Sequence, residues 1–233
     1  MKDSKILSVI HLKKYYGEGE SLVKALDDVS FSVEEGAFVA IVGSSGSGKT
    51  TLLQLIGGLD IPTSGTVFLE DTDIYELEEE ERTILRREGI GFVFQDFNLV
   101  PAISVYDNIV LPLELDDEEL DQDYFKEVIH LLGLEKKLDA YPEQLSGGLK
   151  QRVAIARALI TKPELILADE PTGNLDSKNS QQVLKLLQES SQKFGQTILM
   201  ITHNEELAKM ADVQIQIEDG KIETKNDNVT SMG

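Results

Sequence analysis

The sequence contains no cysteine and no tryptophan, and it has little basic charge for its length. Without cysteine, disulfide bonds and thiolate metal sites are excluded. Lys and Arg together number 22 against 42 Asp and Glu, so the formal net charge is −20. A field of this sign repels phosphate backbones and anionic lipid, so we expect no nucleic-acid partner and no spontaneous adsorption to membranes.

Long hydrophobic runs and a leader pattern are also missing. No apolar run approaches the roughly 18–20 residues of a membrane span. The first residues, "MKDSKILSVIHLKKYY", lack the hydrophobic region of a signal peptide. We therefore expect a soluble, cytoplasmic protein. Acidic residues are densest in Glu114–Asp123, which holds seven in ten residues, and this favours a solvated helix face or loop, with a contact for a basic partner as the alternative.

What the sequence does contain is an alternation of short apolar segments and helical patterns. With 233 residues, 41% of them apolar, the chain can bury a substantial core. Apolar runs without alternation are typical of parallel strands that helices cover on both faces. The predicted strands are Ala37–Val42, Ile90–Phe94, Leu165–Asp169 and Thr197–Thr202. The predicted helices between them are Lys49–Ile56, Ser177–Phe194 and Asn204–Met210.

Two regions depart from this alternation. Near the N-terminus, "ALDDVSFSV" alternates apolar and polar residues through Leu26–Val33, which predicts an antiparallel, half-exposed strand. The middle of the chain has few strand signals and two helical stretches, Asp121–Leu132 and Ser146–Ile160. We interpret this part, about 96–159, as a helical insertion in an α/β core formed by 1–95 and 160–225. A frayed tail is expected at 226–233.

The motif with the clearest chemistry is "GSSGSGKT", which matches the G-x-x-x-x-G-K-[ST] phosphate loop between a predicted strand and a predicted helix. Its glycines let backbone N–H groups surround a β-phosphate, Lys49 bridges β and γ oxygens, and Thr50 ligates Mg²⁺. The cofactors expected are ATP and Mg²⁺, and the fold class expected is a P-loop NTPase (RecA-like) core. The phosphate-binding residues predicted are Gly43, Ser44, Ser45, Gly46, Ser47, Gly48, Lys49, Thr50 and Thr51.

An acidic pair follows the third predicted strand. Asp169 ends that strand at the edge of the sheet where the phosphate loop also lies, and it is expected to hold Mg²⁺ through water. Glu170 is expected to face the γ-phosphate and orient the attacking water. An acidic pair after a strand is commonly only a turn or a cap, and its combination with the phosphate loop is what favours catalysis.

Three further residues are placed near the nucleotide by their position in the pattern. Gln95 follows a predicted strand and is expected to contact Mg²⁺ or water, whereas a lone Gln is ordinarily a loop residue. His203 ends another strand and is expected to bond the γ-phosphate and support Glu170, with helix capping as the alternative. Tyr16 is expected to stack on adenine, and Tyr15 is the alternative.

In their order along the chain, these motifs resemble those of the ATP-binding cassette (ABC) ATPases over nearly the whole sequence. The phosphate loop, Gln95, "LSGG" at Leu145–Gly148, "LILADE", "NLD" at Asn174–Asp176 and His203 carry the resemblance. "GGLDIPTSG" and "ADEPTGNLD" further resemble the subgroup that serves lipoprotein release, export of macrolides or antimicrobial peptides, and cell-division signalling.

The resemblance implies that two copies pack head to tail. Ser146, Gly147 and Gly148 would then cap the γ-phosphate held by the other copy's Lys49, and Asp176 would also belong to the nucleotide site. A helix start with bare glycines suits an anion. This sequence departs from the family in having Leu149 and Lys150 where a Gln usually follows "LSGG", so the polar contribution of that Gln is missing.

The function implied is that of an ATPase energising a separate membrane permease at the cytoplasmic face of the membrane. The permease is expected to contact the segment Asn98–Ile109, which follows Gln95. Two alternatives remain open: a signalling or division complex in which nothing is transported, and a soluble family member acting on ribosomes or DNA. The cargo is not encoded in this chain.

Overall fold

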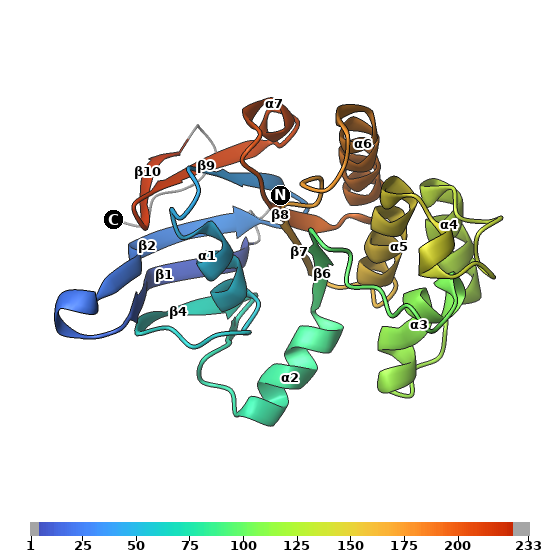
Figure 1. Ribbon diagram of the computed structural model, residues 1–233. Helices are drawn as coiled ribbons and strands as arrows, with labels where there is room; N and C mark the ends of the chain where they lie inside the picture. The colour runs from blue at the N-terminus through green and yellow to red at the C-terminus, as the bar shows by residue number, and fades with distance from the viewer. Residues whose placement is uncertain (1–4, 226–233) are drawn as a thin grey trace.

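Two β-sheets form the framework of the protein, whose computed structural model describes residues 5–225. The larger sheet has the strand order β10-β9-β3-β8-β7-β6, and the smaller has the order β2-β1-β4-β5 (Figure 1). Their strands are β1 (Lys5–Tyr16), β2 (Val23–Glu34), β3 (Phe38–Val42), β4 (Ser64–Leu69), β5 (Thr72–Asp73), β6 (Ile90–Phe94), β7 (Leu165–Asp169), β8 (Thr197–Ile201), β9 (Val213–Glu218) and β10 (Lys221–Lys225).

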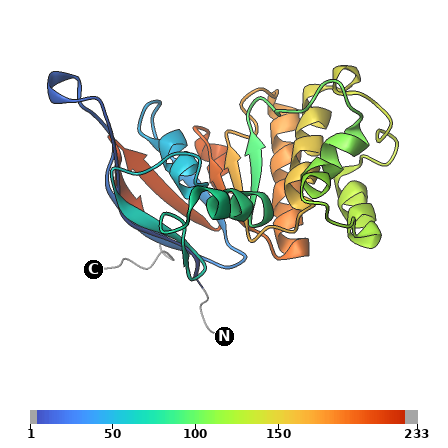
Figure 2. The same ribbon diagram turned by 90° about the horizontal axis from the view of Figure 1, so that it is seen from below.

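The helices pack on both sides of the larger sheet, as Figure 2 shows from below. They are α1 (Lys49–Ile56), α2 (Glu79–Glu88), α3 (Val105–Leu115), α4 (Gln122–Leu132), α5 (Gly147–Leu159), α6 (Ser177–Phe194) and α7 (Glu205–Ala208). Two 3₁₀ turns complete the described elements, η1 (Gly19–Ser21) and η2 (Pro142–Gln144). The expected tail, 226–233, lies outside the described residues.

The central strands of the larger sheet, β3, β7 and β8, are buried on both faces, as their uniformly apolar sequences predict, whereas β9 alternates apolar and polar residues. Strands β9, β3, β8, β7 and β6 pair in parallel, and β10 adds an antiparallel edge. Along β7, Leu165 and Leu167 pack into one apolar cluster with the smaller sheet and α1, whereas Ile166 and Ala168 pack into a second cluster with α3 to α6. Alternate side chains of one strand therefore belong to separate halves of the core.

The smaller sheet is antiparallel, as the alternation in its second strand predicted. Leu26, Val29, Phe31 and Val33 of β2 are buried against the larger sheet. The tip of the β1–β2 hairpin projects from the rest of the molecule in Figures 1 and 2. The region between β6 and β7 contains the helices α3, α4 and α5, and its status as an insertion in the core stays a prediction.

Some predicted bounds were wrong by a few residues at strand and helix ends. Strand β3 begins one residue later than expected, and Thr202 lies outside β8 because its hydroxyl accepts a hydrogen bond from Asn204 in a turn (3.1 Å). The helix expected over 204–210 is confined to α7, since Met210 already donates to Leu207 in a tighter turn (3.1 Å). Within residues 5–225, no helix combines the length and apolarity that crossing a bilayer requires.

Candidate nucleotide site

The loop between β3 and α1 closes tightly because two of its glycines lie against backbone. A Cβ on Gly43 would stand 2.1 Å from the carbonyl oxygen of Ile217, and one on Gly48 would stand 2.2 Å from that of Ala25. Gly48 also has a φ of 100°, a conformation that side chains disfavour. Glycine at both positions is therefore required for the close approach of this loop to the neighbouring backbone. A cavity of about 390 Å³ lies at this loop, lined also by Lys49, Thr50 and Thr51.

The lysine of this loop is buried and folded onto the loop itself. The Nζ of Lys49 donates to the carbonyl oxygens of Gly43 (3.0 Å) and Ser44 (2.7 Å), and it lies 3.4 Å from the hydroxyl of Ser47. These contacts hold a positive charge at the centre of the loop in an otherwise acidic protein. Phosphate oxygens are the ligands that such an arrangement of cation and N–H groups suits.

A carboxylate and a hydroxyl meet beside the loop, from β7 and α1. Burial raises the pKa of Asp169 above its ordinary value, and the negative charge of Glu170 adds to this, whereas the Thr50 hydroxyl and Lys49 act against it. A hard cation placed here would offset the buried negative charge. The described residues hold no group of three His, Cys, Asp or Glu side chains arranged for a metal. One carboxylate and one hydroxyl suit Mg²⁺, which takes few protein ligands and completes its shell with phosphates and water.

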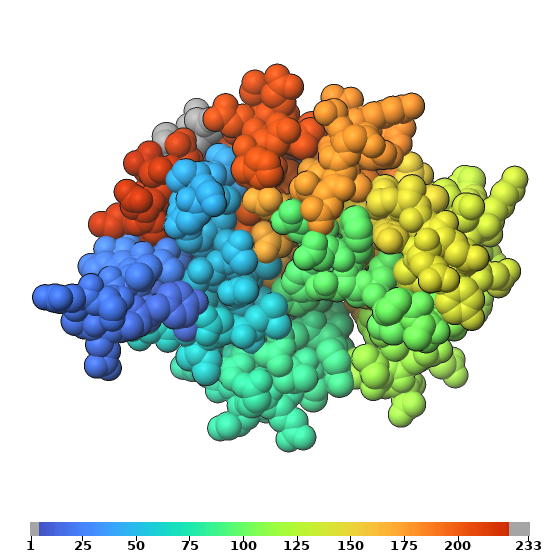
Figure 3. Space-filling view, in the orientation of Figure 1, coloured from blue at the N-terminus to red at the C-terminus, as the bar shows by residue number. Residues whose placement is uncertain are grey.

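The second acid of the pair faces a histidine. Nδ1 of His203 lies 3.1 Å from Oε2 of Glu170, and both border a cavity of about 570 Å³. Glu170 has a φ of 44°, which is strained for a residue with a side chain and is common at functional positions. In Figure 3 the light-blue, green and orange segments that follow β3, β6 and β7 meet on one face.

The side chain of Gln95 binds within the protein. Its Nε2 donates to Oδ1 of Asn174 (3.2 Å), and the Asn174 amide donates back to the Gln95 carbonyl (3.1 Å). The segment after β6 and the segment after β7 are thereby joined, because Phe94 and Asp169 are paired neighbours at the ends of these strands. Gln95 thus lies at the edge of the larger sheet where Asp169 ends β7, as predicted. Its partner there is Asn174, for which no separate role was predicted.

The glycine pair singled out by the sequence begins α5, whose N-cap is Ser146. Its hydroxyl accepts from the N–H of Leu149 at 3.4 Å. A Cβ on Gly148 would come within 2.8 Å of the Asn179 side chain in α6, so the glycine permits close packing of two helix starts. Asp176 caps α6 through the Asn179 backbone (2.9 Å) and side chain (2.6 Å).

The two helix starts that suit an anion lie on opposite faces of the larger sheet. Leu52 and Leu53 of α1 pack in the cluster shared with the smaller sheet, whereas Val153 and Ile155 of α5 pack in the other cluster. Figures 1 and 2 both place α1 and α5 apart, with the sheet between them. The larger sheet therefore separates the starts of α1 and α5 within one chain.

Tyr16 ends β1 beside the phosphate loop, whereas Tyr15 is turned toward β2. The Tyr16 hydroxyl donates to Asp60 (2.9 Å), burial and that bond raise the Tyr16 pKa, and the side chain of Thr51 acts in the opposite direction. The hydroxyl of Tyr15 instead donates to Asp27. Contact with Thr51 places Tyr16, and not its neighbour, next to the first turn of α1.

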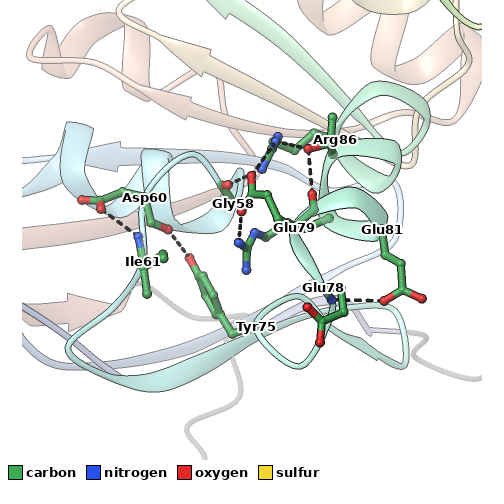
Figure 4. A network of polar contacts seen from close by, with 10 residues as sticks. Gly58, Asp60, Ile61, Tyr75, Glu78, Glu79, Glu81 and Arg86 are labelled. Carbon is green, nitrogen blue, oxygen red and sulfur yellow. Dashed lines mark hydrogen bonds and ion pairs between the residues drawn. The ribbon is translucent and has the colours of Figure 1, made fainter.

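Asp60 holds Tyr16 in place through a polar network that no sequence motif indicated. Burial alone would raise the pKa of Asp60, but bonds from Lys14 (2.7 Å), the Ile61 N–H (2.7 Å) and Tyr16 keep it below its ordinary value. In Figure 4 the same turn is tied through Tyr75, whose hydroxyl donates to the Asp60 carbonyl (3.1 Å). The ring of Tyr16 is thus held in a fixed position, and 42% of the Tyr16 surface is exposed.

We expect Tyr16→Ala to raise the KM for ATP about 3- to 10-fold, because a lost aromatic stack is worth about 0.5–1.5 kcal/mol. Tyr16→Phe keeps the ring but loses the bond to Asp60, so it should raise the KM less than Tyr16→Ala. The matched control is Tyr15→Ala, which should leave the KM unchanged. Steady-state kinetics over a range of ATP concentrations measure all three. A larger effect at Tyr15 than at Tyr16 would reverse the assignment.

Known proteins are similar to this chain in both sequence and fold. Residues 26–173 match the family described as ABC transporter. The lipoprotein-releasing system ATP-binding protein LolD of Bordetella pertussis is 44% identical over 93% of this chain and 95% of its own length. The macrolide export ATP-binding/permease protein MacB of Syntrophobacter fumaroxidans is 42% identical over 97% of this chain. The match covers 32% of the length of MacB.

Solved structures agree with the sequence comparisons. The ATP-binding cassette MJ0796, solved as a dimer in a post-hydrolysis state bound to ADP and Pi, superposes with a TM-score of 0.83 at 38% identity. The match covers 94% of this chain and 97% of that one. Sequence identity and fold therefore agree over nearly the whole chain, and the protein belongs to the ABC transporter family of ATP-binding cassettes.

Proposed function

We propose that this chain, an ATP-hydrolysing subunit of an ABC transporter, energises a separate membrane permease that extracts or exports a lipoprotein, macrolide or antimicrobial peptide. The similarity to LolD and MacB supports this range of cargo. The observation that carries the mechanism is the placement of α1 and α5 on opposite faces of the larger sheet. Two anion-binding ends that stand apart in one chain are complementary in two chains packed head to tail.

Within one site, the residues of this chain have distinct tasks. The phosphate loop binds the β- and γ-phosphates through its N–H groups and Lys49, and Tyr16 stacks on adenine. Thr50 and Asp169, with Gln95, would hold Mg²⁺, which supplies charge neutralisation at the phosphates. Glu170 accepts a proton from the attacking water, and His203, 3.1 Å from its carboxylate, holds Glu170 in position.

The second copy completes the site through the start of α5. Ser146, Gly147 and Gly148 bind the γ-phosphate held by the other copy, and Asp176 orders the adjoining start of α6. A helix N-terminus stabilises an anion by about 0.3–1 kcal/mol, and each charge-assisted hydrogen bond adds about 1.5–3 kcal/mol. Since ADP lacks the γ-phosphate, departure of the phosphate after hydrolysis removes these contacts and releases the dimer. Leu149 contributes no polar group, so the contact depends on the serine and the backbone.

The permease docks on the Asn98–Ile109 segment and in the adjoining groove formed by α2, β6, α3 and α5, whose lining contains no residue of that segment. The groove holds about 260 Å³, and its lining includes Phe92, Phe94 and Leu115. Leu115 is 65% exposed, unusually high for a large apolar side chain at the end of a helix. The Asn98–Ile109 segment leads from the Gln95 loop into α3, so movement of a docked helix reaches the nucleotide site over a short path. Docking places the chain at the cytoplasmic face of the membrane.

Leu115→Glu tests this function. It places a charge in the apolar groove and should weaken permease binding about 100-fold, because burial of a leucine is worth about 1.5–3 kcal/mol. ATP turnover of the isolated chain should stay unchanged. Purification from native membranes, with wild type and Leu115→Glu in parallel, should recover a multi-span protein with the wild type alone. Recovery of a ribosome would contradict the proposal, and a cell-wall regulator without cargo movement would favour a signalling complex.

A further inference from the structure

Four consecutive residues after β6 are held from two directions. Asn174 bonds to the first two: it accepts from Nε2 of Gln95 (3.2 Å), and its amide donates to the Gln95 carbonyl (3.1 Å) and to Oδ1 of Asp96 (2.8 Å). Arg157 of α5 bonds to the other two, donating to the carbonyls of Phe97 (3.0 Å) and Asn98 (2.6 Å). Each residue of the loop therefore has a fixed partner outside it.

Asn174 lies in the turn that follows the catalytic acid Glu170. Gly173 donates its N–H to the carbonyl of Glu170 (2.9 Å), so the turn from Glu170 to Asn174 is closed. A Cβ on Gly173 would lie 2.7 Å from Nε2 of Gln95, so the absence of a side chain at Gly173 is what lets the Gln95 amide lie against this turn.

The Arg157 side keeps the loop in a conformation that it would not adopt unaided. Phe97 has a φ of 63° and Asn98 a φ of 48°, both in the left-handed region, which residues with a side chain adopt rarely. The guanidinium donates to both strained carbonyls, and its own burial lowers the Arg157 pKa. Arg157 therefore anchors the loop to α5. Among the described residues, the side chain of Asn174 makes the hydrogen bonds that join the loop to the turn after Glu170.

We propose that Asn174 is a positioning residue for ATP hydrolysis: by clamping Gln95 to the Glu170 turn, it makes the two move as one unit. This inference rests on the proposed roles of Gln95 and Glu170. Asn174 touches neither nucleotide nor metal in this assignment, and it acts only through Gln95. Its effect belongs to kcat, because the phosphate loop that binds ATP lies on another segment.

The test is a double-mutant cycle on the full-length chain, with ATP turnover and ATP affinity measured for each variant. Asn174→Ala should lower kcat about 10-fold, as expected from the loss of about 1.4 kcal/mol of hydrogen bonding, and leave the Kd for ATP unchanged. In a Gln95→Ala background, Asn174→Ala should lower kcat by clearly less than this factor, because only its bonds to the main-chain carbonyl of residue 95 and to Asp96 remain to be lost. Asn174→Asp keeps the acceptor for Gln95 but loses the donor and faces Asp96, so its kcat should be as low as that of Asn174→Ala.

The control variant is Gln122→Ala, which removes an exposed amide at the start of α4 and should retain wild-type kcat. Thermal unfolding of each variant checks the fold. A wild-type kcat in Asn174→Ala, or losses that multiply in the double variant, would overturn the clamp while leaving the ATPase intact. An unaltered kcat in Gln95→Ala would instead contradict the proposed role of Gln95, and the clamp would fall with it.

Discussion

Glu170→Gln is expected to lower ATP turnover by about 10²–10⁴-fold while leaving ATP binding intact. General-base catalysis contributes a factor of this size, and the amide cannot accept the proton of the attacking water. The substitution keeps the shape of the side chain, so the contact with His203 at 3.1 Å loses its charge but not its geometry. Because the γ-phosphate then persists, two copies should stay joined through Ser146, Gly147 and Gly148.

Two measurements on purified Glu170→Gln check this expectation. Phosphate release gives the turnover, and analytical ultracentrifugation with saturating Mg-ATP gives the mass in solution. The expected mass is that of two chains with ATP and one chain with ADP. His203→Ala is the companion variant and should lower kcat less than Glu170→Gln, since it removes only the positioning of the base. Turnover at the wild-type rate would show that another group acts as base, and single chains throughout would contradict the shared site.

Lys49→Ala is expected to weaken ATP binding at least 100-fold and to abolish turnover at cellular ATP concentrations. Charge-assisted hydrogen bonds from the ammonium to phosphate oxygens are worth about 1.5–3 kcal/mol each, and two such bonds exceed a factor of 100. Lys49 is also buried and satisfies the carbonyls of Gly43 and Ser44, so removing it leaves two acceptors unpaired. A lower melting temperature should accompany the loss of binding.

Ligand-induced stabilisation separates these two effects. At 100 times the Kd, a bound ligand adds about 2.7 kcal/mol to the free energy of unfolding, and wild type should show the corresponding rise in melting temperature with ATP. Lys49→Ala should show none, whatever its melting temperature without ATP. Lys150→Ala is the matched control, because it removes a lysine beyond the start of α5 and should keep the ATP-induced rise. An ATP-induced rise in Lys49→Ala equal to that of wild type would remove the phosphate-loop assignment.

Some elements were predictable to the residue because their signals are local. Helix α1 and helix α6 have the predicted bounds, since Gly48 and Asp176 mark their starts and apolar periodicity marks their length. Strands β6 and β7 also match, because short uniform apolar runs leave little choice of limits. The order of chemical groups at the strand ends followed directly from these bounds.

Helices α2 and α3 were not predicted from the sequence, and the reasons differ. Helix α2 is strongly charged and buries only Arg82, so it has no apolar face to detect. Helix α3 contains Pro112, which argues against a helix interior, yet Ser104 and Asp107 form a capping box that signals its start. The capping box was available from the sequence, whereas the packing that stabilises α2 through Arg86 and the Gly58 carbonyl (2.7 Å) was not.

By itself, the sequence determined which chemical groups this protein carries and at which strand ends they stand, because hydrogen bonding within a turn and apolar periodicity act over a few residues. Only the tertiary structure decided which groups meet: Gln95 and Asn174 are 79 residues apart, and Tyr16 and Asp60 are 44 apart. It also decided that α1 and α5 lie on opposite faces of one sheet. Contacts between residues so far apart in sequence depend on how the strands and helices between them pack. The burial of those strands and helices brings the loops that carry these residues together.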